Sequence, residues 1–174
     1  MKIEIHNEEA KDIEQVHEIL RAAFPTDAES KLVAALRANG KAIIALVAAN
    51  SERVLGHILF SPVSITPPGG AAPLINTKGI GLAPVAVHPE AQSQGIGSKL
   101  IREGLRRCKE LGYDYCVVLG NPEYYQRFGF EKASRFGVQN EYGVDDEFML
   151  IHFSEQDPMQ GTAKYAPEFA KFSV

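Results

Sequence analysis

A glycine-bearing turn between a strand-like run and a helix-like run constrains this chain more than any other feature. The turn is Gln92-Ser93-Gln94-Gly95-Ile96-Gly97. It follows an apolar run over residues 79–87 and precedes a run over residues 98–111 whose apolar side chains have helical spacing. The first N–H groups of a helix have no internal partner, and the helix dipole adds partial positive charge there. Because glycine lets a ligand approach the backbone, the pattern predicts a site for an anion such as a pyrophosphate.

Length, charge and cysteine content limit the classes of protein to consider. With 174 residues the chain fits a single domain over 1–174, in which residues 155–174 form a polar C-terminal extension whose aromatic side chains pack it on the body. A net charge of −4 argues against nucleic-acid binding. No apolar run has the length of a membrane span, and the start lacks the apolar core of a secretory signal. We therefore expect a cytoplasmic protein without membrane contact, whose two cysteines, Cys108 and Cys116, are reduced core thiols.

Apolar periodicity and turn residues predict an alternation of helices and strands. The expected helices cover residues 8–23, which Asn7 would cap, and residues 29–39, 98–111 and 123–128. The expected strands cover residues 1–5, 42–49, 53–61, 80–87, 115–119 and 148–153, the second and third of them forming a hairpin. Residues 67–73 are rich in proline and glycine and predict an irregular excursion. This order of elements indicates an α/β (α+β) protein.

Two other families of phosphate-binding turns fit the glycine turn poorly. A dinucleotide fold requires a third glycine, and an acidic residue at the end of the next strand. The third glycine is missing, and Asp114 lies at the start of that strand. A phosphate-binding P-loop requires G-x-x-x-x-G-K-[ST], which does not occur in the sequence. A plain strand-to-helix turn without a ligand remains the simplest alternative.

The wider pattern resembles the GNAT superfamily of acetyltransferases. Its signature is [Q/R]-x-x-G-x-[G/A] after a strand, matched here by residues 92–97, and a Tyr-x-x-x-Gly-Phe helix, matched by residues 125–130. Residues 120–130, 142–148 and 161–169 look similar to the bacterial YhbS-like branch. The resemblance implies a mixed, largely antiparallel sheet with helices on both faces. Many members have a basic residue where this chain has Gln94, but the donors of the turn are backbone N–H groups.

The resemblance also implies acetyl-CoA as cosubstrate. Its pyrophosphate would lie on the N–H groups of the turn, formed by Gln92, Ser93, Gln94, Gly95, Ile96, Gly97 and Ser98. Its amide-rich arm would pair with the preceding strand at Val85, Ala86 and Val87, in the manner of an added β-strand. That strand must then diverge from the strand over residues 115–119, which Pro84 permits, although an ordinary bulge explains Pro84 equally well. Asn121 is a candidate for a hydrogen bond to the arm and also suits the turn before Pro122.

Acetyl transfer needs a donor for the developing oxyanion and a donor for the leaving thiolate. A backbone N–H near Val85 or Ala86 would supply the first. The family's general-acid position falls on Tyr125, which would supply the second, although aromatic residues of this kind also simply fill space. Tyr124 is interpreted as packing or as a wall of the acceptor pocket.

The general base is the least defined part of the predicted site, because residues 82–87 contain no ionisable side chain. Glu29 opens the second helix, in a region that borders the acceptor site in the superfamily, and could hold or deprotonate a cationic amine. It is also the acid that a helix dipole favours in a first turn. His57, His88 and Glu123 are weaker candidates with simpler structural roles, and bulk water remains open as the proton acceptor. No cluster of residues has metal-ligand spacing.

The sequence thus predicts an N-acetyltransferase that moves an acetyl group from acetyl-CoA to a primary amine in a ternary complex. Tyr125 and Glu29 are its candidate catalytic residues. A non-catalytic acyl-CoA sensor or interaction protein on the same fold is the alternative, because the preceding strand lacks a glutamate. The acceptor, a small molecule or a protein amine, is not identified, and the resemblance is compatible with a homodimer.

Overall fold

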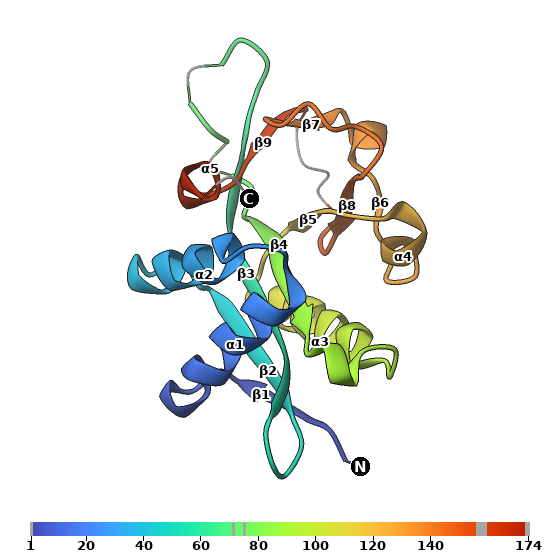
Figure 1. The fold of residues 1–174 in the computed structure, drawn as a ribbon. Coiled ribbons are helices and arrows are strands. Elements are labelled where there is room, and N and C mark those ends of the chain that lie inside the picture. Colours follow the sequence, from blue (N-terminus) through green and yellow to red (C-terminus); the bar gives the residue numbers. More distant parts are fainter. Residues whose placement is uncertain (1, 71, 75, 156–159, 173–174) are drawn as a thin grey trace. The chain divides into compact units, whose positions relative to one another are not determined.

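The computed structural model describes residues 2–70, 72–74, 76–155 and 160–172 (Figure 1). Its strands are β1 (Glu4–Asn7), β2 (Ile44–Ala49), β3 (Val54–Thr66), β4 (Gly79–Val87), β5 (Tyr115–Leu119), β6 (Glu131–Lys132), β7 (Val138–Asn140), β8 (Phe148–His152) and β9 (Gly161–Lys164). Its α-helices are α1 (Ile13–Ala23), α2 (Ala28–Ala38), α3 (Ile96–Glu110), α4 (Pro122–Gln126) and α5 (Glu168–Lys171). Short 3-10 helices are η1 (Ala10–Asp12), η2 (Pro89–Ala91) and η3 (Ala133–Phe136).

The chain divides into two structural units, which we describe one at a time. Unit 1 consists of Met1–Ser61, Ala83–Arg106 and Pro167–Val174, and unit 2 consists of Pro62–Leu82 and Arg107–Ala166. The strands β3 and β4 and the helix α3 each contribute residues to both units. The expected single domain over 1–174, with residues 155–174 as an extension, stays a prediction.

Unit 1 contains the predicted hairpin, with helices on both of its faces. The strand β2 pairs antiparallel with β3, from Ile44 opposite Phe60, and β1 pairs antiparallel with the other edge of β2. Side chains alternate along a strand, so neighbouring residues of β3 face opposite sides. Gly56 lies against Leu100 and Ile96 of α3, whereas His57 lies on the other side, 3.5 Å from a carboxylate oxygen of Glu8. That second side is covered by α1 and α2, whose buried residues include Val16, Leu20, Leu32 and Leu36 (Figure 1).

Unit 2 contains a mixed set of strands. The strand β5 pairs parallel with the first residues of β4 and antiparallel with β8, and β8 pairs antiparallel with β6. The strand β9 pairs antiparallel with the end of β3 and parallel with β7. Its core includes the fully buried rings of Tyr115, Phe130 and Phe148. The pairings of both units confirm the predicted fold class, a mixed and largely antiparallel sheet.

The elements differ from the prediction in a few places. Asn7 does not cap a helix but is the last residue of β1, and the helical region begins instead at η1, where the Asp12 carboxylate accepts the Glu9 N–H at 2.9 Å. β3 runs beyond Ser61 to Thr66, because its last residues pair with β9. No helix in the described part of the chain is long and apolar enough to cross a membrane.

Candidate functional site

The predicted anion site is a tight turn before α3, and we call its residues 92–98 the cradle. Ser93 and Gly95 have φ angles of 66° and 81°, which bend the chain sharply. The helix begins at Ile96, two residues earlier than expected, and its first bond joins the Lys99 N–H to the Gly95 carbonyl at 3.1 Å. The N–H groups of Ile96, Gly97 and Ser98 therefore have no acceptor within the helix. A Cβ at Gly95 would meet nothing within 4 Å, so space for a ligand adjoins these donors.

Hydrogen bonds at the start of the cradle fix how the chain enters it. His88 Nδ1 accepts the Glu90 N–H at 3.2 Å, which caps η2. The side chain of Gln92 donates to the Val87 carbonyl at 3.3 Å, and so it is turned back toward β4. The 3-10 helix η2 also contacts α1. His88 thus has a structural role at this cap, as its simpler interpretation predicted.

The strand β4 is paired with β5 over only part of its length. The register joins Gly79 to Tyr115, Ile80 to Cys116 and Gly81 to Val117, and residues 82–87 lie beyond this paired section. The other edge of β4 neighbours β3, and the His88 N–H donates to the Leu55 carbonyl at 2.8 Å. Of the residues predicted to hold the cosubstrate arm, Val85 and Val87 are half-buried and Ala86 is buried. The edge of β4 that β5 leaves uncovered is thus continuous in the chain with the cradle.

Asn121 and Tyr125 lie together in unit 2, at α4. Asn121 Oδ1 accepts the Glu123 N–H at 2.9 Å and so caps this helix, which leaves its amide NH₂ available as a donor. The ring of Tyr125 packs so closely over Gly120 that a Cβ there would lie 2.3 Å from it. Tyr124 and Phe130 meet the same ring edge-on, with centroids at 5.1 and 5.7 Å. The helix α4 therefore presents a tyrosine held firmly by its neighbours.

Burial makes the hydroxyl of Tyr125 a weaker acid than that of an exposed tyrosine. The residue is 8% exposed, and burial, followed by Tyr124 and Cys116, raises its pKa to about 12. Its hydroxyl makes no hydrogen bond to any residue that the structure describes. Tyr125 is a protonated phenol at neutral pH, as any tyrosine is, and it can donate a hydrogen bond to a ligand.

Glu29 departs from the environment of an ordinary first-turn acid. The residue is half-buried in α2, and its Oε1 is buried without a hydrogen-bond partner among the described residues. Other polar groups near this turn have partners close in the sequence. Thr26 Oγ1 accepts the Ala28 N–H at 3.2 Å, and Lys31 pairs with Asp27 at 3.3 Å. A solvated acid beside a helix dipole has no need of burial. An unpaired buried carboxylate oxygen is unfavourable unless a donor, from a ligand or from water, completes it.

The remaining candidates for a base have other environments. Glu123 is an exposed first-turn acid of α4. His57 is fully buried, in keeping with its simpler structural role, and its Nε2 lies 3.5 Å from Glu8 Oε1. Both cysteines are free and buried, and burial raises the pKa of Cys108 to about 12, which confirms the prediction of core thiols.

A part-buried polar network in unit 1 was not predicted. Arg37 donates to both carboxylate oxygens of Glu8, with Nε and Nη2 at 3.2 and 2.7 Å, and its Nη1 lies 3.1 Å from His17 Nε2. His17 Nδ1 lies 2.7 Å from Ser30 Oγ. The side chains of Glu8 and Arg37 are only 7% and 23% exposed. His17, Ser30 and Arg37 are ordinary polar positions of two amphipathic helices, Glu8 lies before the first of them, and no local signal marks these residues as partners.

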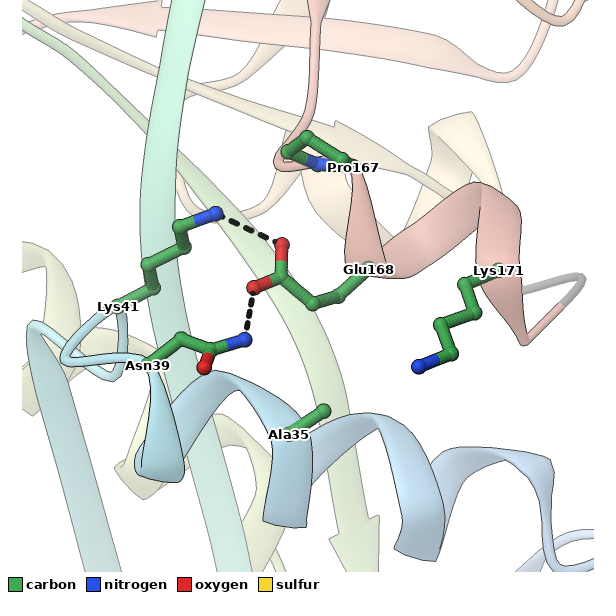
Figure 2. Close-up of a pocket in the computed structure, with 6 residues that line it drawn as sticks. All are labelled: Ala35, Asn39, Lys41, Pro167, Glu168 and Lys171. Atoms are coloured by element: carbon green, nitrogen blue, oxygen red, sulfur yellow. Dashed lines mark hydrogen bonds and ion pairs between the residues drawn. The ribbon is translucent and has the colours of Figure 1, made fainter.

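A cavity of about 320 Å³ also lies in unit 1, and none of the predicted site residues lines it (Figure 2). It is lined by Ala35, Asn39, Lys41, Pro167, Glu168 and Lys171. The buried Glu168 carboxylate accepts from Lys41 Nζ at 2.9 Å and from Asn39 Nδ2 at 2.7 Å. Those two bonds attach α5 to the C-terminal end of α2, so the polar groups of the cavity serve to hold the structure together.

Comparison with known proteins defines the family. Residues 4–133 match the acetyltransferase (GNAT) domain. The chain belongs to the GNAT family of acetyltransferases, which confirms the resemblance inferred from residues 92–97 and 125–130.

Two relatives are similar over almost the whole chain. The chain is 33% identical to YhbS of Escherichia coli, described as an uncharacterized N-acetyltransferase, over 92% of this chain and 95% of the relative. The crystal structure of that protein in complex with CoA matches with a TM-score of 0.87, over 97% of this chain and 92% of the other. A GNAT family acetyltransferase from Brucella melitensis in complex with acetyl-CoA is 36% identical and matches with a TM-score of 0.78, over 97% and 98% of the two chains.

Proposed function

We propose that this protein transfers the acetyl group of acetyl-CoA to a primary amine, in a ternary complex and without a covalent enzyme intermediate. The observation that carries the proposal is the cradle, where unpaired N–H groups at the start of α3 adjoin open space at Gly95. Such a helix start binds phosphate groups through its backbone. The CoA and acetyl-CoA complexes of the two similar GNAT proteins support the same cosubstrate here.

Residues of β4, together with Asn121, are proposed to bind the remainder of the cosubstrate. Beyond its paired section, β4 offers backbone groups at Val85, Ala86 and Val87 to an amide-rich arm that binds as an added strand. Pro84 has no N–H to leave unpaired on this stretch. The Asn121 NH₂ group, not used by its capping bond, is proposed as a further donor to the arm.

Acetyl-CoA supplies the thioester carbonyl that the amine attacks. The proposed residues stabilise the charge that develops on its oxygen and hold the attacking amine. A backbone N–H near Val85 or Ala86 stabilises the oxyanion that forms as the amine attacks. The new C–N bond forms, the C–S bond breaks, and the electron pair leaves on the CoA sulfur. Glu29 holds the acceptor's ammonium and receives one proton from it, directly or through water, before the neutral amine attacks. The second proton leaves the nitrogen for water once the C–N bond has formed.

Tyr125 is proposed to stabilise the leaving thiolate. A phenol with a pKa of about 12 is a weaker acid than a model thiol, whose pKa is about 8.5. Complete proton transfer to the sulfur is therefore unfavourable in this environment, and the tyrosine acts mainly by donating a hydrogen bond as negative charge develops. Final protonation of the thiolate can then come from water.

Two measurements test this function. Isothermal titration should detect acetyl-CoA binding, and the absence of binding at millimolar concentration would defeat the proposal. Thiol release should then be followed with a panel of n-butylamine, ethanolamine, spermidine and Nα-acetyl-lysine. We expect Tyr125→Phe to lower kcat by about a hundredfold while acetyl-CoA binds as before. A variant with the wild-type rate would remove Tyr125 from the mechanism.

The alternative of a non-catalytic acyl-CoA sensor rests on one observation, the absence of an ionisable residue from positions 82–87 of β4. A sensor would bind acetyl-CoA in the titration but release no thiol with any amine. The acceptor, a homodimeric state and a cytoplasmic location stay predictions from the sequence.

A further inference from the structure

The network from Glu8 to Ser30 has a defined pattern of donors and acceptors. An arginine side chain has N–H donors and no acceptor, so His17 Nε2 must accept the bond from Arg37 Nη1. The proton of the neutral ring then lies on Nδ1, which donates to Ser30 Oγ at 2.7 Å. Burial, and next the charge of Arg37, lowers the pKa of His17, in agreement with a neutral ring. His17 could bind another proton only by losing its bond to Arg37, which excludes it as the base of the reaction.

The other end of the network is fixed as firmly. Two guanidinium nitrogens of Arg37 hold the two oxygens of the Glu8 carboxylate, an arrangement that restricts both the position and the plane of the guanidinium. Glu8 directly follows β1, and its own N–H donates to the Ala45 carbonyl of β2 at 2.9 Å. The network therefore runs from Glu8, beside β1, to Arg37 near the end of α2. It continues through His17 of α1 to Ser30 in the first turn of α2.

The energetic cost of such a network suggests that it does more than stabilise the fold. Buried charges lose hydration, and apolar side chains of similar volume often stabilise a fold as well or better. What the network supplies is a fixed geometry, and it ends at Ser30, which is 7% exposed. The next residue toward the N-terminus is Glu29, with its buried and unpaired Oε1.

We propose that Ser30 and His17 are positioning residues of the acceptor site, which fix the first turn of α2 so that the Glu29 carboxylate is held ready for the ammonium of the acceptor. This inference rests on the proposed function, because it assumes that Glu29 binds the acceptor. The acceptor is then a primary amine that binds as its cation.

A double-mutant cycle between Ser30→Ala and Glu29→Gln tests the proposal. The acceptor is the amine of the panel with the highest thiol release. Ser30→Ala should raise the KM for this amine about tenfold, as expected for the loss of one hydrogen bond that positions a charge. Both kcat and the dissociation constant of acetyl-CoA should stay within about twofold of the wild type. In the Glu29→Gln background, Ser30→Ala should have no further effect, because the group that it positions has been removed.

Two variants of His17 separate the two bonds of its ring. Asparagine places an NH₂ group where Nδ1 donates to Ser30, whereas glutamine places its oxygen where Nε2 accepts from Arg37. His17→Asn should thus keep a KM near the wild-type value, and His17→Gln should match Ser30→Ala. Lys31→Ala is the matched control, because it removes the exposed pair with Asp27 from the same turn and leaves the network intact.

The outcomes distinguish failure of the inference from failure of the function. An unchanged KM in Ser30→Ala, or an equal increase in the presence and absence of Glu29, would show that the network only supports the fold. A wild-type protein that releases no thiol with any amine of the panel would overturn the proposed function, and the inference with it. Unfolding temperatures of all variants, measured by circular dichroism, confirm that each one is folded at the assay temperature.

Discussion

Replacement of Glu8 by glutamine should destabilise this protein, by an amount that depends on pH. Burial raises the pKa of this carboxyl, but His57 and then Arg37 outweigh burial and lower it from 4.5 to about 2. A difference of one pKa unit corresponds to about 1.4 kcal/mol, so ionised Glu8 contributes about 3 kcal/mol to folding at neutral pH. His57 Nε2 is as far as 3.5 Å from Glu8 Oε1, and we therefore take this figure as the upper end.

The sign of the pH dependence follows from the direction of the pKa change. A carboxyl whose pKa is lower in the folded state stabilises the fold fully above its unfolded value and loses that contribution as the pH falls. With values of 4.5 and about 2, the contribution of Glu8 decreases from about 3 kcal/mol at pH 7 to about 1.5 kcal/mol at pH 3. Glu8→Gln cannot titrate at this position. The stability difference between the wild type and the variant should therefore become smaller in acid.

Urea unfolding, followed by circular dichroism at several values between pH 7 and pH 3, measures this difference directly. Glu90→Gln is the control, because Glu90 pairs with Arg53 at 2.9 Å on the surface, where its side chain is 68% exposed. Exposed pairs contribute little, so this variant should unfold almost like the wild type at each pH. The reasoning is refuted if Glu8→Gln is as stable as the wild type at pH 7, or if its deficit is the same at every pH.

Three further predictions concern the cradle, the core and the C-terminal helix. Gly95→Ala should weaken acetyl-CoA binding in a titration and cost about 1 kcal/mol in stability, because alanine is strained at a φ of 81° although its Cβ meets no atom. Gly104→Ala should instead lower stability by about 1 to 3 kcal/mol, with unchanged acetyl-CoA affinity in the folded protein, because its Cβ would lie 2.3 Å from the Phe60 ring. Glu168→Gln should increase hydrogen exchange in α5 at neutral pH. Wild-type α5 should loosen in the same way as the pH falls, because the bond from Lys41 lowers the pKa of Glu168 and protonation removes that ion pair. Unchanged exchange in the variant would contradict the role given to this pair.

The cradle and its flanking elements could be predicted because their signals are local. A β-branched run, a turn with glycine at a positive φ and a helix with apolar 3.6-residue spacing follow one another within residues 79–111. The predicted strand over residues 115–119 has the observed bounds of β5. In such segments, neighbours in the sequence decide the conformation, so the pattern carries most of the information.

The strands β7 and β9 could not be predicted, because each is held by partners distant in the sequence. β9 is four residues long, and its residue Lys164 pairs with Ser64 of β3. The bond from Arg37 to Glu8 likewise spans 29 residues. A charged position on an amphipathic helix has the same pattern whether it faces water or a buried partner. Tertiary structure alone distinguishes the two cases.

Glu29 shows why this distinction matters for the chemistry. From the sequence, a glutamate in a first helical turn is explained equally well by the helix dipole and by a role in catalysis. The buried, unpaired Oε1 of Glu29 favours the second explanation, because interaction with a helix dipole does not require the oxygen to be withdrawn from water. Carboxylates are also far weaker bases than alkylamines, whose pKa is about 10.4 in lysine. A carboxylate in this position therefore binds the ammonium before it can deprotonate it. The ammonium nitrogen has no lone pair, so only the small fraction of bound acceptor that has lost one proton attacks. The nitrogen becomes much more acidic as its bond to the acetyl carbon forms, and loss of the second proton is then favourable.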